Sequence, residues 1–133
     1  MTASTRAVEL ATVAARAAED KIAESVVALD VSGQMPLTDI FLIVSADNER
    51  QVASIVDAVE DALRDVGAKR LRREGARESR WVLLDFGDVV VHVQHEEERA
   101  YYELERLWRD CPVLDLQTGA PAAGASDETT DPS

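Results

Sequence analysis

The stretch that decides the fold is WVLLDFGDVVVHV, residues 81–93. Two apolar runs flank the dipeptide Gly87-Asp88, which is the pattern of a β-hairpin with a tight turn. Side chains alternate along a strand, so the first run has Trp81, Leu83 and Asp85 on one face and Val82, Leu84 and Phe86 on the other. Both faces are mostly apolar. We therefore expect an interior hairpin that is covered by helices on both sides.

The residues before the hairpin divide into helical and extended segments by the spacing of their apolar side chains. The expected elements are a helix over 5–22 capped by Ser4 or Thr5, strands over 26–31 and 40–44, a helix from 48 or 49 to 66, and a basic strand over 70–73. Asn48 and Gln51 have the spacing of a capping box, and Gly67 suits the left-handed residue after a helix. The order predicts an α/β fold with a mixed β-sheet and helices on both faces.

A further helix is predicted over residues 97–109, after the hairpin. Its apolar stripe includes Leu104, whereas Tyr102 points to the opposite, charged side. Tyr102 is then either a solvated tyrosine or a contact residue for a partner. The same two interpretations apply to Trp81, which is either packed in the core or an interface anchor, because Trp and Tyr are enriched in binding hot spots.

Composition predicts one domain over residues 1–116 and a disordered acidic tail over 117–133, where the chain loses all periodicity. Cys111 is the single cysteine, so an internal disulfide is excluded. The first 22 residues lack the apolar core of a signal peptide, and no run has the length of a membrane span. We expect a cytoplasmic protein without a membrane partner.

Charge disfavours nucleic acid as the main partner. The chain has 26 acidic and 14 basic side chains, a net charge of -12, and an acidic body repels a phosphate backbone. A basic protein surface suits it better. Residues 69–80 are a local exception, with six basic and two acidic side chains. They are either a charge-protected edge strand or a patch that contacts ribosomal RNA at the rim of a protein interface.

No assembled catalytic or metal site is evident in the sequence. Asp85 and Asp88 stand three residues apart across the turn, and no Gly-Ser phosphate loop accompanies them. His92 is predicted to be a hydrogen-bonded histidine in or near the core, and Cys111 has no partner at zinc spacing. We expect no metal, no cofactor and no enzymatic activity. A small nucleotidyl- or phosphoryl-transferase is the alternative, and spacing alone leaves a Cys-His nucleophile open.

Three segments carry a resemblance to a known family. They are LTDIFLIVSADNERQVASIVDAV (37–59), WVLLDFGDVVVHV (81–93) and ERAYYELERLW (98–108). Together they resemble the ribosomal silencing factor family, RsfS or Iojap, over about residues 5–116. The combination of the second and third segments is specific, whereas each alone would be a weak signal.

The resemblance implies a nucleotidyltransferase-like fold and a binding function. A member of this family would bind the large ribosomal subunit through its ribosomal protein fourteen, block joining of the small subunit, and so repress translation. It also suggests a homodimer. By position, the implied partner-binding residues are Trp81, Val82 and Tyr102, with Asp85, Glu103 and Leu104 as further candidates.

Overall fold

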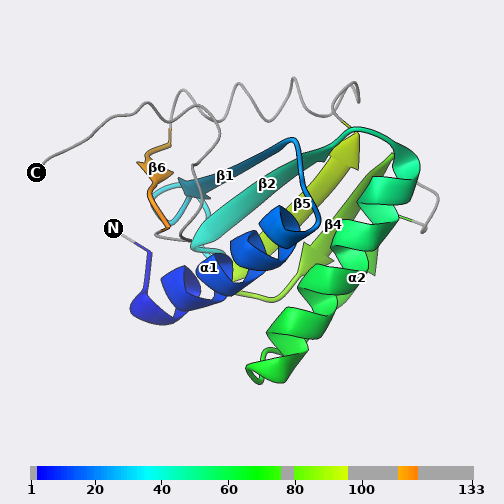
Figure 1. Cartoon of the computed structure of the whole chain (residues 1–133). Coiled ribbons are helices and arrows are strands. Elements are labelled where there is room, and N and C mark those ends of the chain that lie inside the picture. The colour runs from blue at the N-terminus through cyan, green and yellow to red at the C-terminus, as the bar shows by residue number, and fades with distance from the viewer. Residues whose placement is uncertain (1–2, 76–79, 96–110, 117–133) are drawn as a thin grey trace, which may run out of the picture.

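The computed structural model describes residues 3–75, 80–95 and 111–116, which form a six-stranded sheet and two helices (Figure 1). The elements are α1 (Thr5–Asp20), β1 (Ser25–Asp30), β2 (Ile40–Ala46), α2 (Glu49–Asp65), β3 (Arg72–Glu74), β4 (Trp81–Asp85), β5 (Val89–His95) and β6 (Val113–Leu114). The strand order is β3-β4-β5-β2-β1-β6. The predicted mixed α/β architecture is confirmed.

The sheet is mixed because its two central strands, β2 and β5, run parallel while the other neighbours are antiparallel. The predicted hairpin is β4 and β5. Its turn is closed by a hydrogen bond of 2.9 Å from the Phe86 amide to the Val89 carbonyl, and Gly87 takes a φ of 87°. A positive φ suits glycine, which has no Cβ to clash. The predicted turn chemistry is therefore confirmed.

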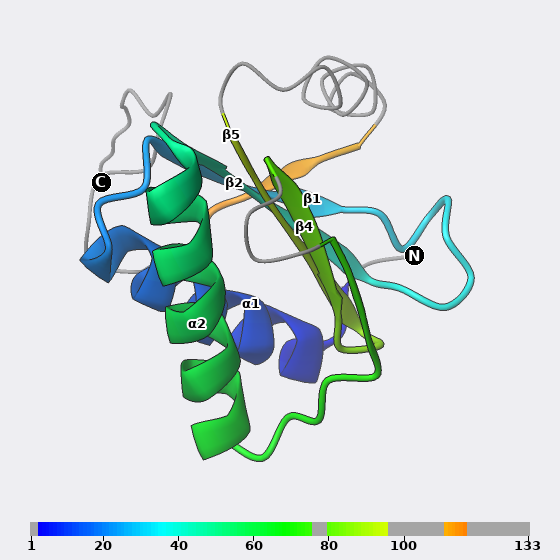
Figure 2. The same cartoon turned by 90° about the vertical axis from the view of Figure 1, so that its right-hand side faces the viewer.

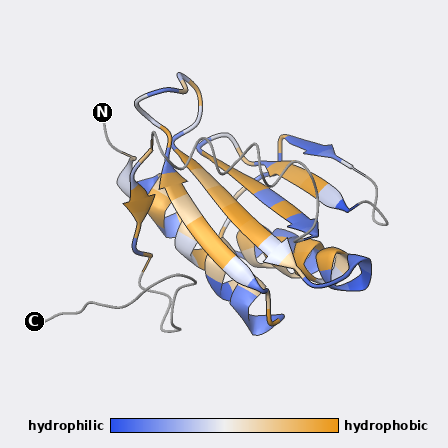
Figure 3. Ribbon diagram, turned by 90° about the horizontal axis from the view of Figure 1, so that it is seen from above, coloured by the Kyte–Doolittle hydropathy of each residue, from blue (hydrophilic) through white to orange (hydrophobic). Residues whose placement is uncertain are grey.

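Both described helices lie on the same face of the sheet (Figure 2). The side of α1 that meets the sheet is rich in buried alanines, which let the helix approach closely: Ala7, Ala11, Ala14, Ala15 and Ala18. On the sheet itself, Leu42, Val82 and Val91 belong to the same buried cluster. Figure 3 shows apolar residues along the central strands and hydrophilic residues on the outer sides of the helices.

The opposite face of the sheet has a second buried cluster: Leu29, Val31, Phe41, Ile43, Val90 and Cys111. Both faces are thus buried, as the apolar strands predict. The helix expected over residues 97–109 lies outside the described residues. The prediction of helices on both faces is therefore confirmed for one face and stays a prediction for the other.

The helix starts follow from their caps. The Ser4 hydroxyl accepts from the Ala7 amide at 3.1 Å, and the Asn48 side chain accepts from the Gln51 amide at 2.8 Å. The reciprocal half of the capping box differs from the prediction. The Gln51 side chain accepts from the amide of Asp47, at 2.7 Å, rather than from that of Asn48. Its amide nitrogen also donates to the carbonyls of Lys21 and Ile22, so it ties the α1–β1 turn to α2.

Some boundaries differ from the predictions for physical reasons. Helix α1 stops at Asp20, before the expected residue 22, because Ile22 has a φ of 60°, which no right-handed helix permits. Strand β6 was not predicted, since two residues are too few to show a period. The edge strand β3 covers residues 72–74 rather than 70–73.

Candidate partner-binding surface

Trp81 is the first residue of β4 and lies at one end of the sheet, where it pairs with Gln94 of β5. Its side chain faces away from α1 and α2, because the next residue, Val82, belongs to the core beneath those helices. Trp81 is half-buried. The structure thus combines the two interpretations of Trp81: part of the indole is packed and part remains accessible.

The packed part of the indole rests on a histidine. The rings of Trp81 and His92 are stacked, with centroids 6.1 Å apart and planes 13° apart. On the neighbouring strand, the rings of Phe41 and His92 are 4.9 Å apart and tilted by 56°. The three rings form a diagonal across β4, β5 and β2. Such diagonal neighbours are within contact range for aromatic side chains.

Burial sets the charge of this histidine. Desolvation disfavours the charged imidazolium and lowers the pKa of His92 from 6.5 to about 4. The ring is therefore neutral near physiological pH, with one nitrogen as donor and the other as acceptor. Neither nitrogen has a hydrogen-bond partner among the residues that the structure describes. The prediction of a buried histidine is confirmed, but the predicted hydrogen bond is not found among the described residues, where the ring packs between the rings of Trp81 and Phe41.

Other buried polar atoms around Trp81 also lack a partner. They are the indole Nε1 of Trp81 and both side-chain amide atoms of Gln94, which is fully buried. No sequence motif points to Gln94. Its position could have been found by extending the hairpin register by one residue, since a turn at 87–88 pairs residue 94 with residue 81.

Val82 and Asp85 are the other predicted site residues that the structure describes, and neither lies beside the Trp81 side chain. Val82 is completely buried on the helix-covered face. Asp85 lies at the other end of β4, where its carboxylate accepts from the Gly87 amide at 2.8 Å and braces the hairpin turn. Tyr102, Glu103 and Leu104 lie outside the described residues.

The basic segment has carboxylate partners for the four arginines of its described part. Arg70 and Arg73 both bind Glu60 of α2, Arg72 lies 3.1 Å from Glu74, and Arg80 lies 3.7 Å from Glu49. Glu60 is the least exposed of these acids, and it holds the segment around β3 against α2. These pairs favour the interpretation as a charge-protected edge. A contact with ribosomal RNA remains a prediction.

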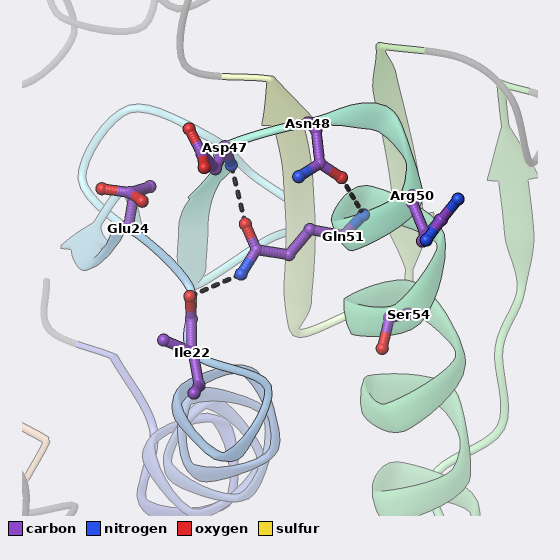
Figure 4. Close-up of a pocket in the computed structure, with 7 residues that line it drawn as sticks. All are labelled: Ile22, Glu24, Asp47, Asn48, Arg50, Gln51 and Ser54. Carbon is purple, nitrogen blue, oxygen red and sulfur yellow. Dashed lines mark hydrogen bonds between the residues drawn. The ribbon is translucent and has the colours of Figure 1, made fainter.

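A surface pocket of about 420 Å³ lies between the α1–β1 turn and the start of α2 (Figure 4). Its lining residues are Ile22, Glu24, Asp47, Asn48, Arg50, Gln51 and Ser54. Ile22 is 77% exposed despite its apolar side chain. Gln51 crosses the pocket between Asp47 and Ile22, and Arg50 points away from them. No sequence signal predicts an isoleucine with a positive φ.

Within residues 3–75, 80–95 and 111–116, no three His, Cys, Asp or Glu side chains come together as metal ligands. None of the helices described there is long and apolar enough to cross a membrane.

Comparisons with known proteins identify the family. A family model described as "Ribosomal silencing factor during starvation" matches residues 4–133. The ribosomal silencing factor RsfS of Halalkalibacterium halodurans is 46% identical over 109 residues, covering 82% of this chain and 93% of that protein. The RsfS of Bacillus subtilis is 46% identical over 107 residues, covering 80% and 91%. A crystal structure of a protein from Bacillus halodurans superposes with a TM-score of 0.72 at 45% identity, covering 80% of this chain and 97% of that one. The chain belongs to the ribosomal silencing factor family, RsfS.

Proposed function

We propose that this chain binds ribosomal protein fourteen of the large subunit with the surface around Trp81, blocks joining of the small subunit, and so represses translation. The observation that carries the proposal is the half-buried indole of Trp81, which stacks on the ring of His92 at the end of the sheet. A partly exposed tryptophan is a typical anchor, because it offers a large contact area and has only two side-chain torsions to order on binding.

Charge supports a protein partner rather than RNA. The net charge of -12 favours approach to a basic protein. The arginines of the segment around β3 are paired with carboxylates, which reduces their attraction for a phosphate backbone. By position in the family motifs, Tyr102, Glu103 and Leu104 would join Trp81, while Val82 would support the strand from beneath and Asp85 would fix the turn.

The mechanism requires no chemistry. If the factor and the small subunit need overlapping space on the large subunit, each lowers the apparent affinity of the other. Repression then depends on occupancy, and its strength rises with the concentration of free factor relative to its Kd. The activity would be regulatory rather than enzymatic, and it would take place in the cytoplasm. The nucleotidyltransferase-like fold implied by the resemblance would serve as a scaffold.

The test is cosedimentation of the purified protein with isolated large subunits, followed by a subunit-joining assay. We expect binding to large subunits, none to small subunits, and fewer joined ribosomes as the factor concentration rises. Pull-down with ribosomal protein fourteen alone would identify the contact. Failure to bind large subunits would reject the proposal. Turnover of a nucleoside triphosphate would instead favour the transferase alternative.

The homodimer implied by the resemblance is tested separately. Light scattering gives the mass in solution, which is 14.5 kDa for one chain. If the dimer used the same surface as the ribosome, addition of ribosomal protein fourteen would dissociate it. A dimer that persisted in the complex would require a different interface.

A further inference from the structure

Three neighbouring side chains break a general rule of protein interiors. More than nine in ten buried polar groups have a hydrogen-bond partner, because losing water without a replacement destabilises the fold. Trp81, His92 and Gln94 together have five buried nitrogen and oxygen atoms without a partner. Among the described residues, no other buried side-chain nitrogen or oxygen atom lacks a hydrogen-bond partner.

The three side chains lie together on the face of the sheet opposite α1 and α2. Trp81 pairs with Gln94 across β4 and β5, and His92 is two residues before Gln94 on the same side of β5. The His92 ring contacts the Trp81 indole by stacking. The unpaired atoms are thus grouped at the residue that is proposed to anchor the partner.

Packing alone does not explain why polar residues occur here. The same face is filled elsewhere by Leu29, Ile43 and Val90, which need no hydrogen bonds. In the row that contains Gln94, the polar pair Ser45 and Ser25 do bind each other, at 2.5 Å between their hydroxyl oxygens. A local rule broken without a compensating contact is typical of a functional position.

We propose that His92 and Gln94 belong to the partner-binding site, as a hydrogen-bonding subsite behind Trp81 for an uncharged polar group of the protein partner. This inference rests on the proposed function. A peptide amide, a side-chain amide or a hydroxyl group has the right chemistry, because the subsite offers both donors and acceptors: the indole NH, the neutral imidazole and the carboxamide.

A charged group fits the subsite less well. The lowered pKa of His92 keeps its ring neutral, and Gln94 is also uncharged, so neither offers an opposite charge. An ion brought into this place would lose its hydration without a counter-charge. Access depends on Trp81, whose indole covers one face of the His92 ring. A rotation of the indole toward the partner uncovers the atoms behind it.

The test uses two variants of the full chain that keep shape and remove polar atoms. His92→Phe preserves a ring between Phe41 and Trp81, and Gln94→Met preserves length. Both should unfold at a higher temperature than the wild type, because unpaired polar atoms have gone. Both should bind isolated large subunits about tenfold more weakly, as expected for loss of a good hydrogen bond. The loss should change little with salt concentration, since no ion pair is involved.

Ser45→Ala is the matched control. It removes a polar group from the same row, but one that is paired inside the protein, so it should lower stability slightly and leave binding unchanged. If His92→Phe and Gln94→Met bind as tightly as the wild type, the inference is overturned while the proposed function stands. It is also overturned if both variants lose stability and binding together, as in a purely structural role. If the wild type does not bind large subunits, the proposed function itself fails.

Discussion

The two faces of the sheet differ in the polarity of their buried side chains. On the face toward α1 and α2, the side chains from the central strands are apolar and buried, such as Leu42 and Val91. On the other face, apolar residues share the surface with His92, Gln94 and a half-buried Trp81. The first face explains why the chain folds. The second has features that folding alone does not require, and it is there that binding should be sought.

The largest effect on stability is expected from a substitution on the helix-covered face. Leu42→Ala removes a completely buried side chain from the central strand β2 and should lower the free energy of unfolding by about 3 kcal/mol, through lost burial and a cavity. Urea unfolding followed by circular dichroism measures this. Leu37→Ala, at an 85% exposed leucine, is the control and should have almost no effect. Similar losses in both variants would contradict the assigned core.

The next effect concerns the second face and pH. The pKa of His92 is about 4 in the folded chain and 6.5 in the reference state, so between these values the unfolded chain holds more protons. Stability from the neutral ring is therefore complete above 6.5, declines as pH falls, and is lost by about pH 4. The total is about 3 kcal/mol. Urea unfolding from pH 7 to 4 should show this decline in the wild type and much less of it in His92→Phe. Parallel pH profiles would be the contrary result.

A smaller effect is expected on the affinity for the large subunit. Trp81→Ala should weaken the complex with large subunits by about 2 kcal/mol, roughly 30-fold, because it truncates the anchor. Stability should fall less than in Leu42→Ala, since Trp81 is only half-buried. Tyr102→Ala should weaken binding by a similar amount if Tyr102 is the second anchor. Titration against ribosomal protein fourteen measures both, and unchanged affinity would remove the residue from the interface.

The smallest expected effect lies outside both faces, in the turn before β1. Ile22→Gly should stabilise the fold by about 1 kcal/mol, because a β-branched residue is strained at a φ of 60° and glycine is not. The side chain is mostly exposed, so little burial is lost. Thermal unfolding gives the sign directly. A lower midpoint would show that Ile22 makes a contribution that its exposure does not suggest.

Sequence patterns predicted the parts of the fold that depend on local rules. The hairpin followed from alternation and the Gly87 turn, and α2 followed from its apolar period, with Asn48 as cap. Strand β6 could not be predicted, because its two residues are placed by long-range pairing with β1. The family followed from three motifs. It could not have come from periodicity alone, since many α/β domains share the same order of elements.

The candidate site was predicted less completely. Trp81 stood out as a large aromatic residue at a strand start. His92 was predicted to have a hydrogen bond, because a buried polar group normally has one, and Gln94 was overlooked. Whether a buried polar atom finds a partner depends on neighbours that are distant in sequence, such as Phe41 for His92. A one-dimensional pattern has no information on this point.

The outer strands of the sheet have a consequence for how partners can attach. At one border β3 is only three residues long and rich in arginine, and at the other β6 has two residues. Within the described residues neither outermost strand is long enough to give an extended ladder of backbone groups, so an incoming chain gains little by adding itself as a further strand. Recognition at the end of the sheet therefore relies on side chains. Single substitutions should therefore change its specificity more than they would change that of a complex formed by strand addition.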